Sequence, residues 1–142
     1  MTSPERACLT IDLDALAHNR AVLVDVARGA EIAAVVKADG YGLGAGPIAR
    51  RLYAEGTRSF FVARLAEGEA LRTALANRDA AIYVLDGLLP GTAERLGASR
   101  LIPVIATGPQ ANAALALAAA AGRYEVAVQI DTGMNQIGRA HV

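Results

Sequence analysis

Short apolar runs alternate along the chain with longer stretches in which apolar residues recur at helical spacing. Several of the runs, such as IAAVV and IYVL, are almost continuously apolar, and this pattern favours strands that are buried on both faces of a parallel sheet. The predicted strands occupy residues 8–13, 31–37, 59–63, 81–85, 101–106 and 124–130.

Helices are predicted between the strands. Residues 14–28 place Leu16, Leu23 and Val26 at helical spacing, and Gly29 is a suitable stop signal. The other predicted helices occupy residues 47–55, 66–75, 110–121 and a shorter segment, 92–96.

This alternation predicts an α/β fold built from repeated βα units. After the first strand, one strand follows another at intervals of roughly 20 to 28 residues, which suits right-handed crossovers in a parallel sheet. A doubly wound sheet and a (β/α)₈ barrel of the TIM type both fit the pattern, but a full barrel needs roughly 250 residues. We therefore interpret residues 1–142 as one unit, the N-terminal portion of a barrel with about five βα units, although a smaller open sheet also fits.

Composition and charge narrow the classes of function. The 14 basic and 14 acidic residues give no net charge, and no basic patch stands out, which argues against a nucleic-acid partner. Cys8 is the only cysteine, so neither an internal disulfide framework nor a cysteine-rich zinc site is expected, and no metal is predicted. The first residues lack the apolar core of a signal peptide and no stretch is predicted to span a membrane, so a cytoplasmic location is expected.

The choice of basic residues is uneven, because 13 are arginine and the only lysine is Lys37. Arginine can replace lysine as a surface charge, but its guanidinium stays protonated and cannot readily replace an amine nucleophile. On the count alone, a functional lysine and a chance survivor are equally good explanations.

Lys37 ends a predicted strand and is followed by glycines at positions 40, 42, 44 and 46. In parallel α/β folds, reactive groups gather at the carboxyl ends of strands. Partial desolvation there favours the free amine, and the glycines allow a sharp turn close to a ligand. A lysine that extends to water at a strand end before a flexible loop would give the same pattern, and the residues alone leave both interpretations open.

Two other glycine-rich motifs do not fit the spacing. A dinucleotide-binding fingerprint that began at Gly42 and Gly44 would need a glycine where Pro47 stands. A phosphate-binding P-loop needs glycine before its lysine, and Val36 precedes Lys37.

Three segments resemble the alanine racemase family. AVVKADGYGLG around Lys37 is similar to the family's lysine motif, whose usual form is VVKADAYGHG. IDTGMNQIG, which contains Asp131, resembles VDTGMNRLG, and IDLDALAHNR resembles the opening segment of the family. The order and spacing of the three segments also agree, and the resemblance covers essentially the whole chain.

The resemblance implies a barrel that binds pyridoxal 5'-phosphate (PLP), followed by a mostly β C-terminal domain, in a homodimer. It implies an isomerase that interconverts L- and D-alanine and so supplies D-alanine for peptidoglycan. By the same resemblance, Lys37 is the Schiff-base lysine that holds the cofactor. Substrate alanine displaces Lys37 and forms an external aldimine with the cofactor. Lys37 is then one of two catalytic bases, and Tyr41 lies near the cofactor phosphate.

Two positions depart from the family pattern. Gln136 stands where most members have an arginine that orients the substrate carboxylate, and Gln129 stands where many have a lysine that pairs with it. Because both members of the charged pair are replaced by neutral glutamines, neither leaves a buried charge unpaired. A neutral amide, however, binds a carboxylate more weakly than a bidentate guanidinium does. The departures therefore leave room for a racemase that acts on another amino acid.

The remaining barrel strands and the β domain of the family, with its catalytic tyrosine, are not part of these 142 residues. We therefore expect the chain alone not to racemise alanine, and turnover by the purified chain would contradict this. A PLP-binding barrel without racemase activity and an inactive truncated product are also compatible with the sequence.

Overall fold

The computed structural model describes residues 8–76 and 78–136, and its centre is a five-stranded parallel sheet. The strands are β1 (Ala34–Val35), β2 (Ser59–Val62), β3 (Ala81–Val84), β4 (Ile102–Ile105) and β5 (Ala127–Val128). The helices are α1 (Leu13–Val26), α2 (Lys37–Tyr41), α3 (Ala45–Ala54), α4 (Leu65–Ala74), α5 (Ala93–Ala98) and α6 (Gly108–Ala121).

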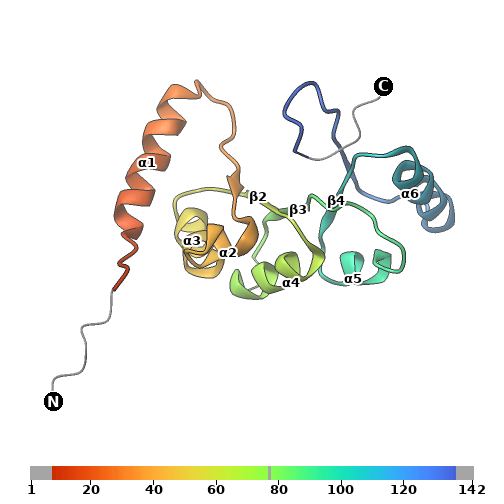
Figure 1. Cartoon of the computed structure of the whole chain (residues 1–142), viewed down its shortest axis with the longest axis horizontal. Helices are drawn as coiled ribbons and strands as arrows, with labels where there is room; N and C mark the ends of the chain where they lie inside the picture. Colours follow the sequence, from red (N-terminus) through yellow and green to blue (C-terminus); the bar gives the residue numbers. More distant parts are fainter. Residues whose placement is uncertain (1–7, 77, 137–142) are drawn as a thin grey trace, which may run out of the picture.

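The strands lie in sequential order, β1-β2-β3-β4-β5, and every neighbouring pair is parallel. Parallel connections are right-handed, so strands that progress in one direction place all their helices on the same face. Figure 1 shows this arrangement, with α3, α4 and α5 in a row along one side of the sheet. A doubly wound sheet would reverse its strand order. The partial barrel is therefore confirmed.

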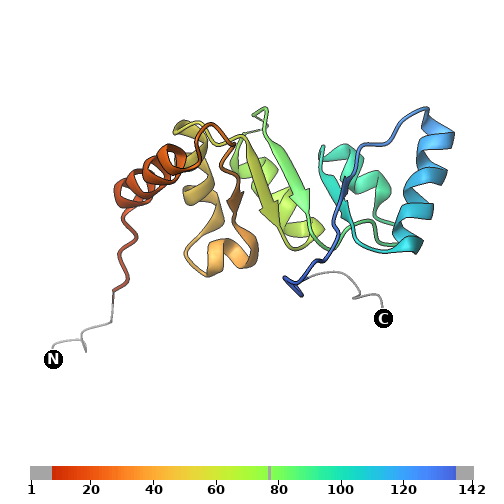
Figure 2. The same ribbon diagram turned by 90° about the horizontal axis from the view of Figure 1, so that it is seen from above.

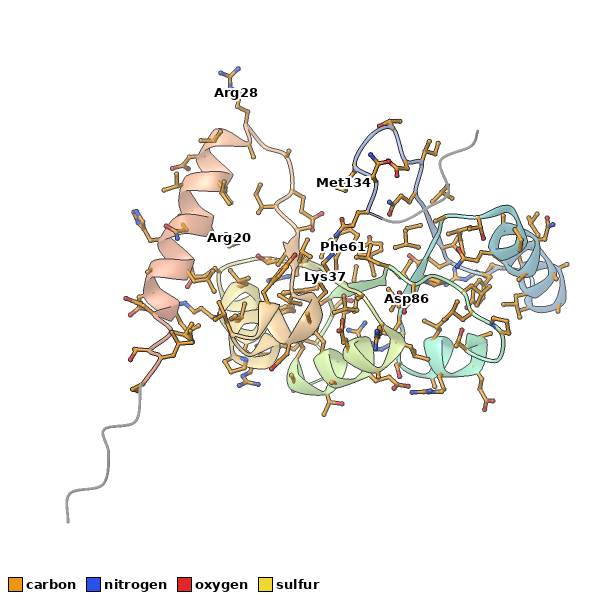
Figure 3. The ribbon with its side chains drawn as sticks, viewed as in Figure 1. Arg20, Arg28, Lys37, Phe61, Asp86 and Met134 are labelled. Atoms are coloured by element: carbon orange, nitrogen blue, oxygen red, sulfur yellow. The ribbon has the colours of Figure 1, made fainter. Side chains whose placement is uncertain are left out.

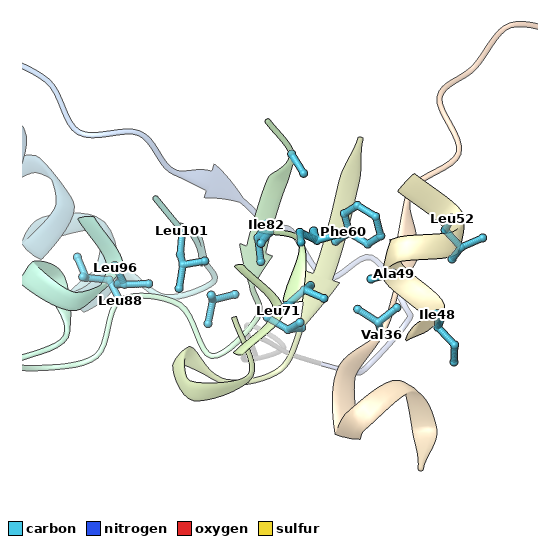
Figure 4. Packing of buried hydrophobic residues seen from close by; sticks show 14 of the residues in the cluster. Val36, Ile48, Ala49, Leu52, Phe60, Leu71, Ile82, Leu88, Leu96 and Leu101 are labelled. Atoms are coloured by element: carbon cyan, nitrogen blue, oxygen red, sulfur yellow. The ribbon is translucent and has the colours of Figure 1, made fainter. Parts of the chain in front are cut away.

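The main hydrophobic core lies between the sheet and this row of helices. Phe60 and Val62 of β2 and Ile82 and Val84 of β3 are buried on the helix side, because alternate strand residues point to opposite faces. Figure 4 shows Phe60 and Ile82 with Leu71 of α4, and Val62 and Val84 belong to the same cluster.

The opposite face of β2 and β3 is only partly covered by the described residues, so the predicted burial on both faces holds for one face of these strands. In β4, the consecutive residues Pro103, Val104 and Ile105 are all buried, so there the prediction holds for both faces.

The predicted helices are all present, with ends shifted by a few residues. The predicted strand at 8–13 is wrong. Residues 8–12 have no regular structure, and Asp12 instead caps α1, accepting hydrogen bonds from the N–H groups of Asp14 and Ala15, both at 2.9 Å. The predicted strands 31–37 and 124–130 shorten to β1 and β5. No helix in the described part of the chain is both long and apolar enough to cross a membrane.

Gly87 allows the ends of β3 and β4 to approach each other closely. Its φ is +73°, and a Cβ atom at this position would lie 2.6 Å from the Val104 carbonyl oxygen. Gln110 fastens the same junction: its Nε2 donates to the Asp86 carbonyl oxygen at 3.0 Å, and its Oε1 accepts from the Ala106 N–H at 3.0 Å. The carboxyl ends of two strands are thus held together by one side chain.

We predict that Gly87→Ala lowers the free energy of unfolding by about 3 kcal/mol, because backbone must move away from the new methyl group. Gly91→Ala is the matched control. Gly91 has a similar φ of +75° but nothing within 4 Å of an added Cβ, so only the backbone strain of about 1–2 kcal/mol remains. Urea unfolding followed by circular dichroism measures both losses, and equal losses would contradict the close approach.

Candidate functional site

Two segments that are far apart in the sequence lie at the same edge of the sheet. Because all five strands are parallel, their carboxyl ends share an edge. Figure 2 shows the turn of α2 after β1 and the segment 131–136 after β5 at this edge. These are the two segments that carry Lys37 and Gln136.

The chain reverses directly after β1 in a left-handed turn. Lys37 is the first residue of α2, two residues beyond the end of β1, so it does not end the strand as predicted. Ala38, Asp39 and Gly40 follow with φ values of 51°, 52° and 63°. Left-handed conformation costs a residue with a side chain roughly 1–2 kcal/mol, so this turn requires support from its surroundings.

Hydrogen bonds within the segment supply part of that support. The Gly40 N–H donates to the Val36 carbonyl oxygen and the Gly42 N–H to the Ala38 carbonyl oxygen, both at 2.9 Å. Asp39 Oδ1 accepts from the Ala45 N–H at 2.8 Å, which ties the turn to the first residue of α3. The turn is therefore closed at both ends.

Glu67 of α4 supplies a contact from outside the segment. Its Oε1 accepts from the Ala38 N–H at 3.2 Å, and its Oε2 accepts from the Ala63 N–H at 2.8 Å and the Arg64 N–H at 3.4 Å. One carboxylate thus joins the residue after Lys37 to the residues after β2. The sequence patterns did not point to Glu67, although its position at the third residue of a helix is a typical one for capping.

Lys37 itself is half-buried beside β2. Among the described residues, its Nζ has neither a hydrogen-bond partner nor an ion-pair partner. Figure 3 shows Lys37 next to Phe61, whose carbonyl oxygen accepts from the Val36 N–H at 2.9 Å. The Phe61 ring stacks on Tyr83, with ring centroids 4.7 Å apart and planes at 16°. Lys37 therefore lies beside the strand that carries Phe61, one of the two stacked rings.

The other candidate residues share the edge without contacting Lys37 through a hydrogen bond in the described structure. Tyr41 is four residues along the same turn and is 62% exposed. Gln136 is exposed, whereas Gln129 is half-buried and its N–H donates to the Ile105 carbonyl oxygen at 2.9 Å, continuing the β4–β5 pairing. The roles expected for Tyr41 and Gln136 remain predictions.

Asp131 organises the loop that leads to Gln136. Its Oδ1 accepts from the Gly133 N–H at 2.9 Å and from the Asn135 N–H at 3.1 Å, and these bonds lower the pKa of the carboxyl group. An aspartate that accepts from backbone N–H groups in this way is common in turns that follow a strand. Within residues 8–76 and 78–136, no three His, Cys, Asp or Glu side chains gather in a way that could hold a metal.

Comparisons with known proteins agree with this geometry. A family model described as "Alanine racemase, N-terminal domain" matches residues 11–141. Alanine racemase from Methylobacterium sp. (strain 4-46) is 46% identical over 138 residues, which are 96% of this chain and 37% of that protein. "Alanine racemase, catabolic" from Mesorhizobium japonicum is 47% identical over 135 residues, 94% of this chain and 35% of that protein. The chain thus spans little more than a third of the length of these relatives.

Solved structures show the same fold. Alanine racemase from Bartonella henselae, with covalently bound pyridoxal phosphate, superposes with a TM-score of 0.82 at 32% identity, covering 90% of this chain and 36% of that one. Histidine racemase from Leuconostoc mesenteroides superposes with a TM-score of 0.74 at 28% identity, covering 89% of this chain and 34% of that one.

The Asp131 turn gives a pH-dependent prediction. Because the folded pKa lies below the ordinary value of about 3.9, the turn is fully stabilised above that value and loses this contribution as the pH falls through the lower folded pKa. The amide resonances of Gly133 and Asn135 should follow this titration by NMR. In Asp131→Asn, which has the same shape and does not titrate there, the two resonances should stay constant. A midpoint at or above the ordinary value would contradict the prediction.

Proposed function

This chain belongs to the alanine racemase N-terminal domain family, and we propose that it provides the PLP-attaching part of an enzyme that interconverts L- and D-alanine. Lys37 is the residue to which the cofactor attaches. The observation that carries the proposal is the state of this lysine, which is the only one in the chain, is half-buried, and has an amine without a partner among the described residues.

The side chains near Lys37 suit PLP chemically. The cofactor offers an aldehyde carbon, an aromatic ring and a phosphate, and an amine is the group that bonds covalently to the aldehyde. The stacked rings of Phe61 and Tyr83 give an aromatic surface on the two strands that follow β1, close in the sheet to Lys37. Tyr41 is proposed for the phosphate, because it occupies the matching position in the lysine motif. When bound, PLP supplies an electron sink for negative charge at the substrate Cα.

Lys37 also has a second proposed role as a base. Racemisation requires proton exchange on both faces of the substrate Cα, so each face needs its own proton carrier. Once its Nζ is released from the cofactor, Lys37 can take a proton from Cα or return it on one face. The turn of α2 limits how far the amine can move, because the backbone on both sides of Lys37 is held by hydrogen bonds from Val36 and Ala38.

The substrate class depends on the loop after β5. We propose that Gln136 donates an amide hydrogen bond to the substrate carboxylate, with less discrimination than a guanidinium would provide. A racemase of another amino acid is the second candidate, and the superposition with a histidine racemase gives it support. The homodimer that the family resemblance implies is likewise a proposal.

Covalent trapping tests the central role of Lys37. After incubation with PLP, borohydride reduction fixes any cofactor–amine bond, and peptide mapping by mass locates it. Because the chain has one lysine, the α-amino group is the only competing amine. We expect a pyridoxyl adduct on Lys37.

Lys37→Arg is the matched control for this experiment. It keeps the positive charge but cannot form the bond, because guanidinium stays protonated, so only the α-amino group should be labelled. Equal labelling of Lys37 before and after unfolding in urea would show an amine without any special environment, and the proposal would fail.

A further inference from the structure

We propose that Glu67 is a positioning residue for Lys37, in addition to capping α4. Its carboxylate holds the backbone on the C-terminal side of the lysine and thereby fixes the direction in which the amine leaves the sheet. The inference rests on the proposed function of Lys37.

Capping of α4 accounts for only one of the two carboxylate oxygens. Oε2 accepts from the N–H groups of Ala63 and Arg64, which precede the helix, and this is the ordinary task of an acidic residue at the third helical position. Oε1 accepts from the Ala38 N–H at 3.2 Å, 29 residues away in the chain. This second contact adds nothing to the helix.

The contact falls within the strained part of the turn. Ala38 has a side chain and a φ of +51°, and Asp39 follows with +52°. On the other side of Lys37, the Val36 N–H is held by the Phe61 carbonyl oxygen at 2.9 Å. Lys37 thus lies between two anchored amides, of which the first depends on strand pairing and the second depends on Glu67. Without the carboxylate, Ala38 can relax to a conformation with negative φ, and the Lys37 side chain then turns with it.

Glu67→Ala removes this contact together with the cap. Asp12→Ala is the matched control, because Asp12 also caps a helix by accepting two backbone N–H bonds, at the start of α1, which Figures 1 and 2 both place far from α2. The readout is the ratio of pyridoxyl label on Lys37 to label on the α-amino group after reduction. We expect Glu67→Ala to lower this ratio about tenfold, the effect of one lost charge-assisted hydrogen bond, and Asp12→Ala to leave it unchanged.

A measurement without cofactor supports the same comparison. Reductive methylation with ¹³C-formaldehyde labels Lys37 and the α-amino group, and because Lys37 is the only lysine, its methyl resonance is distinguished from that of the α-amino group and reports its surroundings directly. We expect Glu67→Ala to move this resonance toward its position in the urea-unfolded chain, while circular dichroism stays native.

The double variant Glu67→Ala with Ala38→Gly should recover part of the labelling ratio, because glycine adopts positive φ without strain. If Glu67→Ala does not fold, Glu67→Gln, which keeps one acceptor oxygen, replaces it. We then expect a smaller fall in the labelling ratio and a smaller shift of the resonance.

The outcomes separate this inference from the proposed function. If the unchanged chain labels Lys37 no better than the α-amino group, the proposed role of Lys37 fails. If the unchanged chain prefers Lys37 and the folded Glu67 variant keeps both the ratio and the resonance, only the inference about Glu67 fails. An equal fall in Asp12→Ala would also overturn it, because loss of any helix cap would then suffice.

Discussion

The structure at the candidate site depends on one constraint: the chain must stop extending at Val35 and reverse within a few residues. Residues with side chains resist the left-handed turn that does this, so the turn exists only because its N–H groups find acceptors. Asp39 binds the start of α3, and Glu67 binds the residue after Lys37. The same contacts that make the turn possible therefore determine where the only lysine is placed.

The rest of the fold places this turn at the carboxyl edge of the sheet, together with the segment after β5. Sequential parallel strands place the helices on one face, and the buried residues of β2 and β3 fix the sheet against α3 and α4. Since the strands are parallel, the segment after β5 arrives at the same edge as the turn after β1. The main hydrophobic core thus lies on the helix side of the sheet. Phe61, Tyr83 and Lys37 lie at the carboxyl edge and on the opposite face.

The sequence predicts the repeated βα units well because their patterns are local. The central strands and all the long helices follow from apolar spacing and from glycine stops. The predicted strand at 8–13 is wrong because a short apolar run does not show whether a neighbouring strand is present to pair with it. Asp12 in this segment instead caps a helix, which is a local role. The candidate site is predicted only in part. Lys37 stands out because it is the only lysine, but nothing local predicts that the two residues after it adopt positive φ, a conformation that residues with side chains rarely take. Glu67 is also missed, because its decisive bond reaches across 29 residues to Ala38 and so follows from the assembled sheet.

The most direct test of how Lys37 is held is the hydrogen exchange rate of the Ala38 amide in the intact chain, measured by NMR. We expect exchange at least about tenfold slower than in an unstructured peptide, because this N–H is bonded to the Glu67 carboxylate in a closed turn. Exchange at the unstructured rate, while the amides of β2 and β3 remain protected, would show that the turn holding Lys37 is not fixed and would contradict its proposed role in placing the amine.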